Sequence, residues 1–232
     1  MLDSRHQRVA AAVVALAYVG VQSFQWYVFG ALPPTADAAQ ALLQGAHPLN
    51  LTRALSMLLS FFGLAYLFLV ACAIGYRRRP SAALVAFLGF FVFCLLEVVL
   101  RSIEFFHVYL ALPTQFQAAT TAAEQAALLA QPELFGSIQH AVYFPLGLCW
   151  MLGSALLCYA LGDQRIDRLA QFGFGLNAVR LLLRQLDVYA FPPSDFDALY
   201  EMLYLPLVWL TFVPIAIWLL WRREPVTVAA MR

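Results

Sequence analysis

The segment Leu96-Glu97-Val98-Val99-Leu100-Arg101-Ser102-Ile103-Glu104-Phe105-Phe106-His107 places four ionisable side chains inside an apolar stretch that is long enough to cross a bilayer. At about 100° per residue in an α-helix, Glu97, Arg101 and Glu104 lie within about 60° of one another. His107 lies about 60° beyond Glu104, so all four side chains can share one face. A charged group at the bilayer centre costs on the order of 3 kcal/mol, so this face is expected to line a bundle interior or a wet cavity.

The composition around this segment is that of an integral membrane protein. Hydrophobic residues make up 63% of the 232 residues and charged residues only 12%, against roughly 25% charged in soluble domains. The net charge of +1 gives no indication of a nucleic-acid partner. All 14 basic residues are arginine, which excludes a Schiff-base lysine. Abundant Ala and Arg without Lys also suggest a GC-rich bacterial genome.

Apolar segments divide the chain into an all-α, polytopic transmembrane helix bundle in a single domain. At about 20 residues per span, the length accommodates six spans. Residues 114–131 are rich in Ala, Gln and Thr and predict an exterior loop or a short surface helix. Gly173-Phe174-Gly175 is typical of close helix packing. The predicted spans are residues 9–32, 53–76, 81–112, 134–161, 169–191 and 200–221.

The arginines outside the spans indicate the orientation, because Lys and Arg are retained on the cytoplasmic side. If the spans alternate in direction, these arginines fall on one side and the opposite loops contain none. This pattern predicts a multi-pass protein of the inner (cytoplasmic) membrane with both termini in the cytoplasm. The arginines counted are Arg5, Arg8, Arg77, Arg78, Arg79, Arg165, Arg168, Arg222, Arg223 and Arg232.

In this orientation the ionisable residues of the spans gather in the outer half. A polar pocket that opens outward and is closed below by an apolar plug is therefore expected. Planar guanidinium groups suit carboxylate and phosphate. The leading hypothesis is therefore that the pocket binds a small anionic or amphipathic molecule in a role related to transport. Membrane lipids are the other expected partners. The candidate residues are Glu97, Arg101, Glu104, His107, His140, Arg180, Arg184 and Asp187, with Gln25 and Glu201 at similar depth.

Two other readings of these residues stay open. In the first, the charges form a structural ion-pair network that fixes helix registry, with Glu97 as the counter-ion of Arg180, in an assembly subunit. In the second, Glu104-x-x-His107, the i, i+3 spacing of helix-bundle metal sites, joins His140 to hold Zn or Fe in a membrane hydrolase or lipid-modifying enzyme. The leading hypothesis needs no cofactor, and the sequence assigns no catalytic residue.

The chain also resembles an uncharacterised family of small bacterial six-helix membrane proteins. The resemblance rests on Leu100-Arg101-Ser102-Ile103-Glu104, on His140 to Pro145 and on Tyr204-Leu205-Pro206. The segments from Pro33 to Asn50 and from Pro192 to Asp197 are less typical. The resemblance implies the six-helix fold and emphasises Arg101, Glu104 and His140, and it implies no catalysis.

Overall fold

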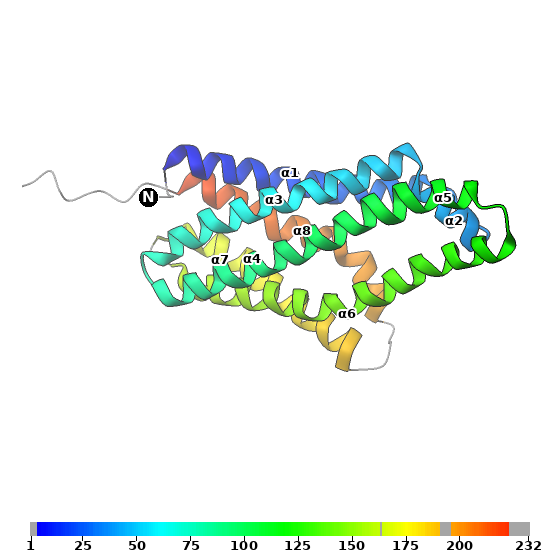
Figure 1. Cartoon of the computed structure of the whole chain (residues 1–232). Helices are drawn as coiled ribbons and strands as arrows, with labels where there is room; N and C mark the ends of the chain where they lie inside the picture. The colour runs from blue at the N-terminus through cyan, green and yellow to red at the C-terminus, as the bar shows by residue number, and fades with distance from the viewer. Residues whose placement is uncertain (1–3, 163, 191–195, 223–232) are drawn as a thin grey trace, which may run out of the picture.

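The computed structural model describes residues 4–162, 164–190 and 196–222, and within them the chain is all-α (Figure 1). Two segments are π-helical and are labelled η1 and η2. α4, η1 and α5 follow one another without a break. The elements are α1 (Arg5–Ala31), α2 (Ala38–Gly45), α3 (Pro48–Tyr76), α4 (Pro80–Ser102), η1 (Ile103–Ala111), α5 (Leu112–Ala118), α6 (Ala122–Ala160), α7 (Asp167–Gln185), η2 (Leu186–Ala190) and α8 (Phe196–Trp221).

The long helices of the described residues, α1, α3, α4, α6, α7 and α8, form a closed ring. Each packs beside the next one along the chain, and α8 returns to pack beside α1. Figure 1 shows them side by side with alternating direction. Residues 114–131, expected to be an exterior loop or a short surface helix, are mostly helical, since α5 extends to Ala118 and α6 begins at Ala122.

Five helical stretches of the described residues are long and apolar enough to cross a membrane, so the fold is that of a helical membrane protein. α7 is more polar and is not among the five. The five stretches are Arg5–Ala31, Pro48–Tyr76, Pro80–Ala118, Ala122–Ala160 and Met202–Trp221.

Two arginines of the α3–α4 turn cap the end of α6. Arg78 Nη1 donates to the Leu161 carbonyl oxygen at 2.8 Å, and Arg79 Nη1 donates to the Tyr159 carbonyl oxygen at 2.6 Å. The last carbonyls of a helix have no partner inside it, and cations near this end are favoured by the helix dipole. The Arg77-Arg78-Arg79 turn therefore joins two hairpins of the ring.

Aromatic side chains of α3, α4, α6 and α7 fill part of the ring interior. Phe68 and Phe90 stack with ring centroids 3.9 Å apart, and Phe93 stacks on Trp150 at 4.3 Å. Phe90 also contacts Phe174 of α7, with centroids 6.0 Å apart. All of these side chains are buried, so the ring interior is closed by apolar contacts at this level.

Glycines let neighbouring helices approach closely. A Cβ at Gly89 of α4 would lie 2.7 Å from the Cys149 carbonyl oxygen of α6. A Cβ at Gly173 of α7 would lie 2.6 Å from the Thr211 carbonyl oxygen of α8. Both distances are shorter than a carbon–oxygen contact allows, so the close packing expected at Gly173 is present.

Gly89→Ala is expected to lower the free energy of unfolding by about 1–3 kcal/mol, because the added methyl group pushes α4 and α6 apart. Gly20→Ala is the matched control, since a Cβ there has no atom within 4 Å. The control should be neutral or stabilising by up to about 1 kcal/mol. Unfolding in mixed detergent micelles measures both variants, and equal effects would contradict the close contact.

Candidate functional site

Arg101 lies at the centre of a network near the C-terminal end of α4. Its Nε donates to Glu97 Oε2 at 3.1 Å and its Nη1 donates to Glu104 Oε2 at 2.7 Å. Its Nη2 donates to Tyr143 Oη of α6 at 2.9 Å. The face predicted for Glu97, Arg101 and Glu104 therefore holds, and both carboxylates are paired with the same guanidinium.

The network continues across the ring to α3 through Tyr109. Tyr109 Oη donates to Glu104 Oε1 at 2.7 Å and accepts from Arg53 Nη2 at 3.1 Å. Arg53 Nε donates to Asn50 Oδ1 at 2.9 Å, and Arg53 Nη1 donates to Gln25 Oε1 of α1 at 3.4 Å. One hydrogen-bonded chain thus connects four helices of the ring at this level.

The π-helix η1 determines which residues join this chain. In a π-helix the bonded turn spans i to i+5, which brings Tyr109 over Glu104, five residues earlier. His107, expected on the Glu104 face from α-helical spacing, instead points outward. It is exposed, and its Nε2 lies 3.0 Å from Gln131 Oε1.

His140 lies away from this network. It is exposed on α6, and its ring packs against Tyr189 of η2 with centroids 5.1 Å apart. Across the described ranges no three His, Cys, Asp or Glu side chains gather as metal ligands. Glu104, His107 and His140, the proposed Zn or Fe ligands, thus have separate partners.

Arg180 of α7 is only 3% exposed and hydrogen-bonds to a neutral group. Its Nε and Nη2 donate to Asn177 Oδ1 at 3.0 and 2.9 Å. Asn177 Nδ2 donates in turn to Ser154 Oγ of α6 at 2.8 Å. The expected pairing of Glu97 with Arg180 is wrong as a direct contact, because Glu97 is paired with Arg101.

Arg184 lies one turn further out on α7. Its Nη1 is 3.3 Å from Asp187 Oδ2, and its guanidinium carbon is 5.0 Å from the Tyr200 ring centroid. Asp187 is buried at the start of η2. The side chain of Glu201, expected at this depth, lies outside the described residues.

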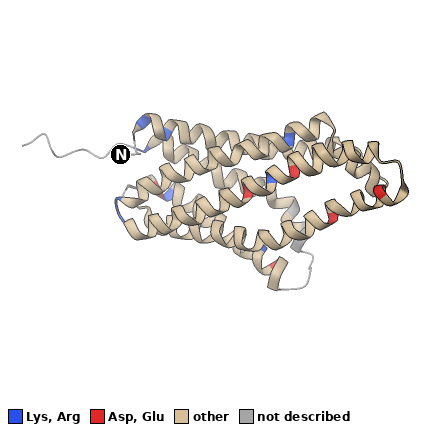
Figure 2. Ribbon diagram, in the orientation of Figure 1, with Lys and Arg blue, Asp and Glu red and all other residues tan. Residues whose placement is uncertain are grey.

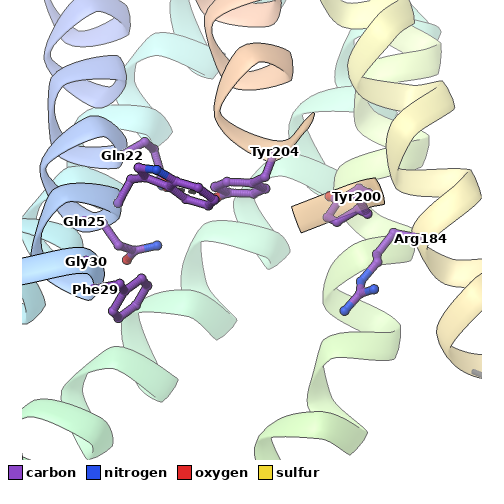
Figure 3. A pocket seen from close by; sticks show the side chains of 8 residues that line it. Gln22, Gln25, Phe29, Gly30, Arg184, Tyr200 and Tyr204 are labelled. Carbon is purple, nitrogen blue, oxygen red and sulfur yellow. Dashed lines mark hydrogen bonds between the residues drawn. The ribbon is translucent and has the colours of Figure 1, made fainter. Parts of the chain in front are cut away.

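A cavity of about 560 Å³ opens between α1, α7 and α8 beside these groups. Figure 3 shows Gln22, Gln25 and Phe29 on the α1 side, Arg184 on the opposite side, and the two tyrosines of α8 between them. A smaller cavity of about 170 Å³ between α6 and α7 shares Arg184. The larger cavity is lined by Gln22, Gln25, Trp26, Phe29, Gly30, Arg184, Tyr200 and Tyr204.

Arg180 lies behind the walls of both cavities. Its guanidinium carbon is 5.1 Å from the centroid of Trp150, which lines the smaller cavity. It is 5.8 Å from the centroid of Tyr204, which lines the larger one. The two arginines of α7 therefore give this part of the bundle a cationic side.

Charge is distributed unevenly along the bundle. Figure 2 shows basic residues at the end that carries the α3–α4 turn, and mixed acidic and basic residues in the middle and toward the other end. Both cavities lie in the half that carries the mixed charges.

Sequence reasoning missed Arg53 and its partner Asn50 as site residues. The hydropathy pattern makes Arg53 only the first residue of a span, whereas the structure buries its side chain, which is 3% exposed. A signal was available, because this arginine begins a span at the end where the loops contain none. A cation placed against that bias is a reason to expect an interior role.

Comparisons with protein-family models, with curated proteins and with solved structures find no match to this chain. The fold and the site therefore stand on the geometry alone, and the resemblance to an uncharacterised six-helix family stays an expectation.

Proposed function

We propose that this chain is a bacterial inner-membrane protein that binds a small anionic or amphipathic molecule in an outward-facing pocket, in a role related to transport. Its six ring helices cross the membrane and both termini are cytoplasmic. The pocket is the 560 Å³ cavity, with Arg184 in its wall and Arg180 behind Tyr204.

The observation that carries the proposal is the state of Arg180. Among the described residues its hydrogen-bond partner is the amide oxygen of Asn177, and no carboxylate contacts it. A buried charge is costly unless it is paired. An anionic group in the adjacent cavity would supply the missing negative charge at close range.

The rest of the lining suits an amphipathic molecule. Trp26, Phe29 and Tyr204 present aromatic surface, whereas Gln22 and Gln25 present amides on the same wall. Pockets of this size and mixed character are typical of small-molecule sites. An anionic head near Arg184 and an apolar body against α1 match this division.

The pattern of exposure on α7 supports its role as a membrane span in addition to the five apolar stretches. Asn177 and Arg180 are 1% and 3% exposed, so the polar side of α7 faces the ring interior. Phe172, Val179 and Leu182 lie on the outside and are exposed. A low average hydropathy is compatible with a membrane span when the polar residues face the bundle interior.

In this proposal Arg101 has no contact with the ligand. The sequence suggested that Arg101 contacts an anion, but its guanidinium already donates to Glu97, Glu104 and Tyr143. Arg180, whose hydrogen-bond partner is the neutral amide of Asn177, is better placed to attract an anion.

Binding of dodecanoate to the purified full chain tests the proposal. Arg184→Gln is expected to weaken binding about 10- to 100-fold, as the loss of a hydrogen bond to a charged group costs roughly 1.5–3 kcal/mol. Arg180→Gln removes a positive charge behind Tyr204 and is expected to weaken binding by a smaller factor. Arg168→Gln makes the same change on an exposed residue of the same helix and should leave the affinity unaltered. Isothermal titration calorimetry measures all four proteins. No dodecanoate binding by the wild type, or equal affinity in all variants, would refute the proposal.

A second candidate is a structural subunit whose charges only fix helix registry. The network centred on Arg101 favours it, because the single guanidinium bridges two carboxylates and Tyr143 of a neighbouring helix. Buried pairs of this kind can set registry without chemistry. The stability measurements on Arg101 described in the Discussion test this role.

A further inference from the structure

The geometry points to a second anion site, built around Arg53 at the outer ends of α1, α2 and α3. We propose that it takes a small oxyanion, a carboxylate or a phosphate, in a separate cavity of about 340 Å³. This site uses a different arginine from the pocket on α7, so it does not rest on the proposed function.

Arg53 is buried and hydrogen-bonds only to neutral groups. Its three described partners are the oxygens of Asn50, Gln25 and Tyr109. Among the described side chains no carboxylate contacts it, and the nearest link to one runs through Tyr109 to Glu104. Three of the five guanidinium N–H groups are used. One N–H on each terminal nitrogen is left for a further acceptor.

The side chains around Arg53 hold its guanidinium in a fixed position. Its guanidinium carbon lies 4.9 Å from the Phe29 ring centroid and 5.7 Å from that of Tyr109, so two aromatic rings confine it. Tyr109 fits there because Gly45 has no side chain, since a Cβ would lie 2.8 Å from Tyr109 Cδ1. Asn50 is held by its own bond from Nδ2 to the Gly45 carbonyl oxygen at 2.7 Å.

The cavity beside Arg53 is covered by the polar loop that follows α1 and by the short helix α2. Gln44 Nε2 of α2 donates to the Pro33 carbonyl oxygen at 2.8 Å, which connects α2 to the loop after α1. Asp37 Oδ1 accepts from the Gln40 backbone N–H at 2.8 Å and caps α2. The lining residues are Phe29, Leu32, Pro33, Pro34, Thr35, Ala41, Gln44, Gly45, Asn50, Arg53 and Tyr109.

This lining favours a compact oxyanion. Thr35, Gln44 and Asn50 offer hydrogen-bonding groups around the guanidinium, and a planar guanidinium binds two oxygens of carboxylate or phosphate. Phe29 lines this cavity and the larger one. Gln25, which accepts from Arg53, lines the larger one. The two sites are therefore neighbours with separate cations.

Calorimetric titration of the full chain at constant ionic strength tests this site. Inorganic phosphate is one probe, and dihexanoyl phosphatidate below its micelle concentration is the other. We expect Arg53→Gln to lower the affinity at least tenfold, Arg53→Lys to lower it less, and Arg168→Gln to leave it unchanged. Glu104→Gln should raise the affinity several-fold. It removes the carboxylate charge that is linked to Arg53 through the Tyr109 hydroxyl and that competes with a bound anion.

Each outcome decides the inference. Binding of phosphate with this variant pattern supports a soluble oxyanion, and the same pattern with phosphatidate alone supports a lipid head group as the source. Absence of binding for both probes, or an affinity that Arg53→Gln leaves unaltered, overturns the site. If Arg53→Gln fails to fold, an unchanged or lower affinity in Glu104→Gln overturns it. Dodecanoate titrated in parallel against Arg184→Gln and Arg53→Gln separates the two sites, because binding in the α7 pocket is weakened by the first substitution and not by the second.

Discussion

Arg101→Ala is expected to lower the free energy of unfolding by about 3–5 kcal/mol, the usual effect of removing one partner from a buried ion pair. The substitution leaves two carboxylates, Glu97 and Glu104, inside the ring without their shared cation. It also removes the bond to Tyr143 that links α4 to α6. Unfolding of the detergent-solubilised protein in increasing dodecyl sulfate measures the change.

Arg180→Ala provides the comparison. The substitution removes hydrogen bonds to the neutral Asn177 and leaves no carboxylate without its partner. The free energy of unfolding is therefore expected to fall by only about 1–2 kcal/mol. Adding Glu97→Gln to Arg101→Ala should recover part of the stability, because one stranded charge is gone. A larger loss for Arg180→Ala than for Arg101→Ala would contradict the pairing in the structure.

Asp167→Asn is expected to be comparably damaging at the opposite end of the bundle, by about 3–5 kcal/mol. Asp167 Oδ1 accepts from Arg222 and from Trp218 Nε1, the latter at 2.7 Å. Its Oδ2 accepts from the Gln164 backbone N–H at 2.9 Å. The side chains of Asp167 and Arg222 are 1% and 2% exposed. The substitution therefore leaves a cation buried against a neutral amide where α7 begins and α8 ends.

The Asp167 carboxylate also makes the stability of the fold depend on pH, in a direction that its pKa determines. Burial alone raises the pKa of Asp167, but the hydrogen bonds from Gln164, Arg222 and Trp218 outweigh it and hold the pKa below its ordinary value. A carboxyl with a lowered folded-state pKa contributes stability that is present above the unfolded-state pKa and lost as the pH falls through the folded-state pKa. Wild-type stability should thus fall below about pH 4. Melting temperatures recorded from pH 7 to pH 3 should show a shallower decline in Asp167→Asn. The exposed Glu133→Gln serves as the control, and parallel curves for Asp167→Asn and the wild type would exclude this contribution.

Much of the order and many boundaries of the helices could be predicted from the apolar segments and from the prolines and charged turns between them. Pro80 starts α4 after the arginine turn, and Tyr76 ends both the predicted second span and α3. The start of α6 could not be predicted in this way. Hydropathy detects apolar length, whereas residues 122–133 are helical because of Ala and Gln propensity and the Thr121 capping box.

The candidate site was predictable only as far as α-helical geometry holds. Glu97, Arg101 and Glu104 precede or begin η1 and share a face as 100° spacing predicts. His107 comes after the change to π-helical spacing and lies off that face. Partners on other helices, such as Tyr143 for Arg101, depend on how each helix is rotated in the ring, and one sequence does not specify that rotation.

The length of α6 has a consequence for the shape of the protein in the cell. Its 39 residues extend over about 58 Å at 1.5 Å per residue, while a bilayer with its head groups is roughly 40–45 Å thick. α4, η1 and α5 together have the same number of residues. In the proposed orientation, the tip of this hairpin at residues 119–121 stands beyond the lipid head groups, where soluble macromolecules can reach it. If the proposed orientation holds, the two lengthened membrane helices themselves form a water-exposed part of the protein.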